Sequence, residues 1–202
     1  MKYFLLFFIH CCCFHCLLCA QTPSVQLYAV QDGWAANSVN AVIFRKNSLV
    51  THNDTQFIAF YDKDAFVVVG KRKLNSPDWV LQKTPFSGKA SDAHNTISIM
   101  VDGSDYLHLS WNHHGNALNY TRSVAPGALQ FVEKMTMTGL NETSVTYPEF
   151  YLLPNGNLIF FYRDGASGSG NLVINHYNHQ LQNWQQLHSN LRSEEHTSEL
   201  QS

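Results

Sequence analysis

The chain has 202 residues, of which 45% are hydrophobic, 13% aromatic and 14% charged, and its formal net charge at pH 7 is −2. This length suits one ordinary domain with a core of its own. The near-neutral charge provides no basic patch for nucleic acid and no charge run for a membrane surface, which argues against both kinds of partner.

Residues 1–20, MKYFLLFFIHCCCFHCLLCA, have the pattern of a secretory signal peptide. Lys2 gives a short basic start, and an apolar stretch follows from Tyr3 to Cys19 and ends at Ala20, after which a cleavage point is expected. The apolar run is short for a membrane span. A lipoprotein linked through Cys19 and a retained anchor are the alternatives. We predict a secreted or periplasmic protein with no membrane association after cleavage.

All five cysteines of the chain lie inside this N-terminal segment, at Cys11, Cys12, Cys13, Cys16 and Cys19. The mature protein would then contain none, which excludes disulfides, a thiolate nucleophile and a cysteine metal site. An exported protein without disulfides must be held together by its own core, and the aromatic-rich composition suits that requirement.

The last eleven residues, 192–202, read RSEEHTSELQS. They match, codon for codon, the conceptual translation of a common sequencing-library adapter, and we interpret them as an artefact. A solvated polar C-terminus is the alternative. On the artefact interpretation the natural chain continues beyond Leu191, and residues 21–191 are the N-terminal part of a larger domain.

Between the two ends, the apolar pattern is alternation in short runs broken by Gly, Asn, Asp and Pro, which predicts strands. Three segments resemble one another and lie about fifty residues apart, a spacing typical of propellers, solenoids and arrays. They are 55–62 (TQFIAFYD), 105–112 (DYLHLSWN) and 156–163 (GNLIFFYR). A further strand is expected after each of them, at 65–72, 117–122 and 171–177.

Both faces of these segments are largely apolar. In the first segment Phe57, Ala59 and Tyr61 share one face, while Ile58 and Phe60 lie on the other. Stacked antiparallel blades of a β-propeller bury strands on both faces in this way. A β-sandwich is the alternative, but it does not explain the repeat. The predicted fold is therefore all-β, an incomplete propeller of about three to four blades, which we expect to be poorly stable without ring closure.

The stretch 91–120 holds four histidines in different surroundings. His108 lies on a strand face whose equivalents in the other repeats are apolar, which favours a packed structural role. His94 precedes a strand, and His113 and His114 follow one. Strand ends are where the loops of a propeller gather around its central opening, so these three histidines are site candidates. Ordinary turn histidines are the alternative.

Two further candidates stand beside the third repeat. Arg163 directly follows the aromatic strand and precedes a Gly- and Ser-rich loop, and Tyr147 lies in a Tyr-Pro-Glu-Phe sequence ahead of that strand. A surface ion pair with Asp164, which would contribute little, is the alternative for Arg163. Core packing is the alternative for Tyr147.

Three stretches of this sequence resemble the BNR-like repeat family that contains secreted polysaccharide lyases, notably ulvan lyases. They are residues 92–120 with D-A-H-N and W-N-H-H-G, residues 146–150 (TYPEF), and residues 158–177 (LIFFYRDGASGSGNLVINHY). The resemblance covers about 39–184 and implies a seven-bladed β-propeller. The sialidase Asp-box, S-x-D-x-G-x-T-W, is absent from the sequence, so the repeat does not imply a sialidase.

The resemblance implies four catalytic residues: His94, His114, Tyr147 and Arg163. Four neighbours are expected to bind substrate: Asn95, His113, Trp111 and Tyr162. No metal or organic cofactor is required, although a structural metal ion stays open. The expected partner is an acidic polysaccharide, and the expected oligomeric state is a monomer.

These residue types suit β-elimination at a 4-linked uronate. The C5 proton is weakly acidic until the neighbouring carboxylate is neutralised, and Arg163 can bind that carboxylate in a bidentate manner and stabilise the developing dianion. A base must take the proton and an acid must protonate the leaving oxygen. Tyr147 could do both, and His94 or His114 could be the base for the opposite C5 configuration, so the division of roles stays open.

Two other functions fit the same residues. One is a glycoside hydrolase or exo-lyase acting on rhamnose–glucuronic acid linkages. A hydrolase normally needs two carboxylates flanking the bond, and Asp92, Glu149 and Asp164 are the nearest candidates. The other is a non-catalytic glycan-binding propeller, in which aromatic rings stack on sugars and histidines donate hydrogen bonds.

Overall fold

The computed structural model describes residues 25–41, 47–166 and 169–191. The predicted signal peptide and the adapter-like C-terminal segment lie outside these described residues. The described part contains twelve β-strands and no helix, which confirms the predicted all-β class. Accordingly, none of its elements is a helix able to cross a membrane.

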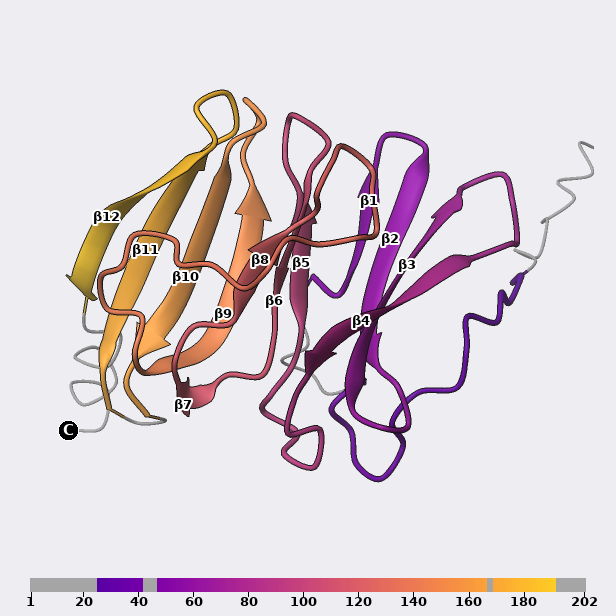
Figure 1. Ribbon diagram of the computed structural model, residues 1–202, viewed down its shortest axis with the longest axis horizontal. Coiled ribbons are helices and arrows are strands. Elements are labelled where there is room, and N and C mark those ends of the chain that lie inside the picture. Colours follow the sequence, from indigo (N-terminus) through magenta and orange to yellow (C-terminus); the bar gives the residue numbers. More distant parts are fainter. Residues whose placement is uncertain (1–24, 42–46, 167–168, 192–202) are drawn as a thin grey trace, which may run out of the picture.

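The strands form three antiparallel sheets that stand side by side in chain order (Figure 1). The first sheet has the order β1-β2-β3-β4, with β1 (Leu49–His52), β2 (Thr55–Tyr61), β3 (Phe66–Lys73) and β4 (Val80–Ser87). The second has the order β5-β6-β8, with β5 (Ser98–Val101), β6 (Leu107–Ser110) and β8 (Tyr120–Arg122). The third has the order β12-β11-β10-β9-β7, with β7 (His114–Asn116), β9 (Val145–Leu152), β10 (Leu158–Asp164), β11 (Asn171–Asn178) and β12 (Asn183–Leu191).

The three similar segments of the sequence become equivalent strands. They correspond to β2, β6 and β10, and each is hydrogen-bonded to an earlier strand on one side and to a later strand on the other. A strand in this position has a neighbouring sheet on one or both faces as well, which explains why its apolar residues do not fall on one face only. The predicted repeat of strands is therefore confirmed.

Two hydrophobic cores fill the spaces between consecutive sheets. One contains Tyr61, Leu109 and Trp111, and the other contains Phe150 and Tyr162. Each core joins residues that are far apart in the sequence, and its apolar burial stabilises the stacking of the sheets.

The sheets also meet through their turns. The backbone N–H of Gly103 donates to the carbonyl of Gly156 at 2.8 Å, and a Cβ on Gly103 would lie 2.7 Å from the Cα of Gly156. Beside them the hydroxyl of Ser104 lies 2.9 Å from Nδ1 of His179. Glycine is required here because any side chain would push the second and third sheets apart.

His108 occupies the interior between the second and third sheets, as its apolar equivalents predict. Its side chain is fully buried, with Nε2 3.2 Å from a carboxylate oxygen of Asp102 and Nδ1 2.8 Å from the hydroxyl of Tyr120. Burial lowers the pKa of His108, against the opposing effect of Asp102. The structural role predicted for His108 is confirmed.

Candidate active site

The four residues predicted to be catalytic meet at one end of the third sheet. β9 runs between β7 and β10, and Thr146 of β9 is paired with His114 on one side and with Arg163 on the other. Tyr147 is the next residue of β9. His94 comes from the loop between β4 and β5 and completes the group. Strand pairing thus brings His114, Tyr147 and Arg163 together, and the β4–β5 loop adds His94.

The two histidines lie face to face at the surface. Their ring centroids are 4.4 Å apart with an angle of 29° between the planes, and the ring of Tyr147 lies 6.0 Å from His94 and 6.2 Å from His114. The guanidinium carbon of Arg163 lies 6.0 Å from the centre of the Tyr147 ring. A base, a phenol and a cation are therefore within reach of one sugar residue.

Asp92 holds the two histidines. Its Oδ1 lies 2.8 Å from Nδ1 of His94, and its Oδ2 lies 2.8 Å from Nδ1 of His114. The carboxylate also accepts the backbone N–H of His94 at 3.0 Å, which closes a turn around the residue between them. Burial raises the pKa of Asp92, but hydrogen bonds from His114 and His94 outweigh it and hold the pKa well below its usual range.

Tyr147 has an unusual backbone conformation. Its φ is +52°, a left-handed value that is rare for a bulky side chain. The pairing of β9 with β10 also shifts here, because Phe161 is opposite Glu149 whereas Arg163 is opposite Thr146. The extra residue makes a β-bulge, and bulges and strained residues gather at functional sites, where they re-aim a side chain.

The four residues expected to bind substrate are not at the surface. Trp111 is buried, stacks on Phe86 at 4.5 Å and donates its Nε1–H to the carbonyl of Ser87. Tyr162 is fully buried, with its hydroxyl donating to the carbonyl of Asn141 at 3.1 Å. Both rings fill the cores between sheets, and their burial does not support the expectation that they bind substrate.

Asn95 and His113 are also buried and support the loops from beneath. The side-chain amide of Asn95 donates to the carbonyl of Lys89, and Nε2 of His113 accepts the backbone N–H of Asn119 at 2.7 Å. Burial lowers the pKa of His113 to about 3, so it is neutral at physiological pH. We therefore reassign both from substrate contact to a structural role.

The sequence did not predict that Asp92 contacts both histidines. The Asp-Ala-His spacing does not show by itself that the carboxylate also reaches His114, 22 positions further along the chain. Asp92, His94 and His114 also offer ligand atoms within 4.8 Å of one another, close enough to hold a metal ion by distance alone. In this structure the same three groups are joined by the two hydrogen bonds to the carboxylate.

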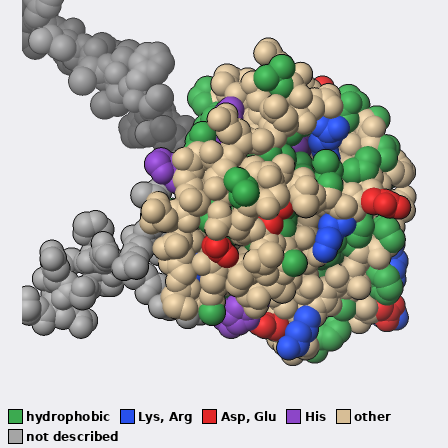
Figure 2. Space-filling model, turned by 60° about the vertical axis from the view of Figure 1, so that its left-hand side comes forward, with side chains coloured by type: hydrophobic (Ala, Val, Ile, Leu, Met, Phe, Trp, Pro, Cys, Tyr) green, Lys and Arg blue, Asp and Glu red, His purple; other side chains and the backbone are tan. Residues whose placement is uncertain are grey.

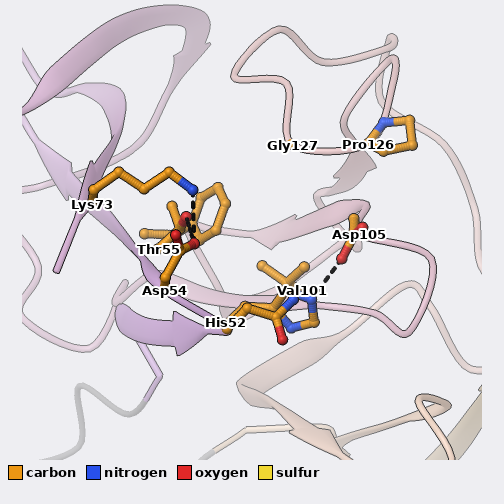
Figure 3. A pocket seen from close by; sticks show the side chains of 10 residues that line it. His52, Asp54, Thr55, Lys73, Val101, Asp105, Pro126 and Gly127 are labelled. Carbon is orange, nitrogen blue, oxygen red and sulfur yellow. Dashed lines mark hydrogen bonds and ion pairs between the residues drawn. The ribbon is translucent and has the colours of Figure 1, made fainter.

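A hollow lined by His52, Lys73 and Asp105 lies apart from the candidate site (Figure 3). It has a volume of about 240 Å³ and lies beside the turn between β1 and β2. Two ion pairs line it, His52 with Asp105 at 2.6 Å and Lys73 with Asp54 at 2.7 Å. The positive and negative groups in it are paired, which leaves no excess charge to attract an acidic sugar.

The surface agrees with the near-neutral charge of the sequence. On the face in Figure 2, Lys and Arg side chains are scattered among Asp and Glu side chains. Such a surface does not concentrate positive charge in one area.

Comparison with known families identifies the chain. The model of the BNR repeat-containing family matches residues 55–200, more than half of the sequence. The chain belongs to the BNR repeat-containing family. The match includes all four residues predicted to be catalytic. A search of curated proteins finds no match.

Several solved structures share the fold of this BNR repeat-containing chain. The polysaccharide lyase Uly1 has a TM-score of 0.63 and 19% identity over 80% of this chain and 44% of its own. A PL25 ulvan lyase has a TM-score of 0.60 and 16% identity over 73% and 38% of the two chains. The same kind of enzyme bound to -[GlcA(1-4)Rha3S]- has a TM-score of 0.64 and 15% identity over 80% and 40%. This chain spans less than half the length of each.

Proposed function

We propose that this BNR repeat-containing protein is a secreted polysaccharide lyase that cleaves an ulvan-like, uronate-containing polysaccharide by β-elimination. The observation that carries the proposal is the meeting of His94, His114, Tyr147 and Arg163 at one end of the third sheet. The signal-peptide pattern of residues 1–20 supports export, and the fold shared with polysaccharide lyases supports the reaction class.

The proposed reaction starts at the uronate carboxylate. Arg163 binds this group and neutralises its charge, so that the C5 proton becomes acidic enough to be removed. Tyr147 or one of the two histidines removes the proton, according to the side of the sugar ring on which the proton lies. A second member of the group then protonates the leaving glycosidic oxygen, and the C4–O bond breaks to give a 4,5-unsaturated uronate.

The carboxylates of the site favour elimination over hydrolysis. Asp92 accepts hydrogen bonds from both histidines, Glu149 is buried and accepts the hydroxyl of Tyr151, and Asp164 accepts the side-chain amide of Asn141. A hydrolase needs one carboxylate as acid and another as base or nucleophile on the two sides of the bond. These three are already committed to neighbouring protein groups.

We also propose that the three sheets are blades of a β-propeller that closes into a ring in the full-length protein. Three consecutive sheets of similar strand order and the greater length of the solved neighbours support this. On this basis the substrate groove includes residues from blades beyond this chain. We propose that the mature protein is a monomer and needs no cofactor for the reaction.

Product analysis tests the proposed reaction. The full-length mature protein is incubated with ulvan and with other uronate polysaccharides, and both ultraviolet absorbance and reducing ends are measured. Growth of absorbance from an unsaturated uronate is the expected result. New reducing ends without absorbance would mean a hydrolase, and binding without any product would mean a glycan-binding module.

The Arg163→Ala variant links that reaction to this site. It is expected to lose turnover by about 10³-fold, because the charge that develops in the transition state is no longer neutralised. Arg122→Ala is the matched control, since Arg122 contacts Tyr177 and Tyr106 away from the histidines. Wild-type rates in Arg163→Ala would remove Arg163 from the proposal.

A further inference from the structure

We propose that Asp92 is the positioning residue of the site and fixes both histidines in the same tautomer. An ionised carboxylate can only accept hydrogen bonds, and its two oxygens each lie 2.8 Å from one imidazole Nδ1. Each Nδ1 must therefore carry the hydrogen. In the neutral rings each Nε2 then carries the lone pair, which is the atom a base needs.

The surroundings of Asp92 support a fixed orientation. Its side chain is 23% exposed, less than those of His94 (40%) and His114 (32%), so the carboxylate lies beneath the two rings. The backbone N–H of His94 binds Oδ1 at 3.0 Å, and the N–H of Asn95 binds the carbonyl of Asp92 at 3.1 Å. One backbone N–H thus holds the carboxylate together with the two rings, and a second fixes the main chain of Asp92.

The two carboxylate oxygens of Asp92 have different partners, so an amide at this position should affect the two histidines differently. Oδ1 accepts both the backbone N–H and Nδ1–H of His94, whereas Oδ2 accepts Nδ1–H of His114. In an Asp92→Asn variant the carbonyl oxygen would stay at the Oδ1 position, where two donors need it. The amide NH₂ would then face His114 and could only donate to its Nδ1.

The expected result is a change of tautomer in one ring only. In the Asp92→Asn variant, His114 would carry its hydrogen on Nε2, while His94 would keep its hydrogen on Nδ1. Nitrogen NMR of the full-length protein labelled with ¹⁵N-histidine, recorded at alkaline pH, where a ring that titrates shows its neutral form, measures the tautomer directly and needs no substrate. Asp105→Asn is the matched control, because Asp105 binds His52 in the distant hollow (Figure 3).

The kinetic part of the inference rests on the proposed lyase function. Loss of the correct tautomer while geometry is kept has lowered turnover by about 10⁴-fold in a serine protease, and we expect kcat to fall by about 10²- to 10⁴-fold in Asp92→Asn. The KM should change by less than about threefold, because Arg163 still binds the uronate carboxylate. Asp92→Glu, which keeps an acceptor-only carboxylate, should turn over faster than Asp92→Asn.

The NMR and the kinetic measurements together distinguish failure of the positioning role from failure of the proposed lyase function. If both rings keep the hydrogen on Nδ1 in Asp92→Asn, the positioning role is wrong whatever the activity. A fall in kcat with unchanged NMR signals would mean a general structural effect and would also overturn it. If the tautomer of His114 changes but the wild-type protein forms no unsaturated product, the positioning role stands and the lyase proposal falls.

Discussion

Two clusters of this protein pair an aspartate with histidine, but one cluster is exposed at the surface and the other is buried. Asp92, His94 and His114 lie at the surface at the end of the third sheet, whereas Asp102, His108 and Tyr120 lie between the second and third sheets. In the buried cluster the side chains of Asp102 and His108 have no exposed area, and in the surface cluster a quarter to two fifths of each side chain is exposed. An aspartate–histidine pair therefore indicates chemistry only where substrate can reach it.

The largest expected effect concerns catalysis by Tyr147, whose ring lies beside the two histidines of the surface cluster. Tyr147→Phe should lower kcat by about 10²- to 10⁴-fold, because it removes the only dissociable proton of this side chain and leaves its ring in place. Unfolding by urea should be nearly unchanged. Tyr106→Phe, in the turn between β5 and β6 where the ring contacts Arg122, is the control that should keep wild-type turnover in the assay for unsaturated products. Equal rates in both variants would exclude Tyr147 from the reaction.

The buried cluster should instead respond in stability. His108→Ala leaves the carboxylate of Asp102 and the hydroxyl of Tyr120 without this partner and opens a cavity, so we expect a loss of about 3–5 kcal/mol in the free energy of unfolding. His114→Ala in the surface cluster should change stability by less than about 1 kcal/mol. Urea denaturation followed by tryptophan fluorescence compares them, and similar losses would contradict the distinction between the clusters.

His113 gives a pH-dependent comparison. Its folded-state pKa is about 3 against an ordinary value of 6.5, so between these values the unfolded chain binds a proton that the folded chain does not. Stability should be complete above about pH 6.5 and should fall towards pH 3 by up to about 1.4 kcal/mol per pH unit from this group. The slope should be smaller in His113→Gln, whose side chain can still accept the N–H of Asn119. An unchanged slope would assign the acid sensitivity to other groups.

The smallest effect is expected for the exposed pair of the distant hollow. His52 and Asp105 lie 2.6 Å apart, but the side chain of Asp105 is 59% exposed, so solvent screens the interaction. Asp105→Asn should change the free energy of unfolding by less than about 1 kcal/mol and should leave the rate in the assay for unsaturated products unchanged. A larger loss of stability would mean that this pair helps to hold the first two sheets together.

The two clusters also show which features of the structure could be predicted from the sequence. Alternation of apolar residues identified the repeated strands, and the shared apolar face identified His108 as a structural residue. Alternation placed Trp111 and Tyr162 on one strand face but did not show that both are buried, and a role in binding substrate was expected for both. Both are aromatic residues near a strand end, and alternation cannot tell a ring that fills a core from one that reaches a groove when both strand faces are covered.

Within the site, the backbone conformation is the feature that the sequence pattern did not predict. The motifs pointed to His94, His114, Tyr147 and Arg163, and the structure brings them together. The positive φ of Tyr147 and the bulge beside it depend on how β9 pairs with β10, which no local pattern encodes. The reach of Asp92 to both histidines depends on the packing of the β4–β5 loop against β7.

The sequence by itself determined the all-β class, the repeat of strands and the residues from which a site could be made, because these follow from local alternation, turn residues and motifs. Only the tertiary structure decided which polar and aromatic residues are exposed, and that one carboxylate serves two histidines. Burial and side-chain partners depend on contacts between segments distant in the chain, here the loop before β5 and the strands β7, β9 and β10.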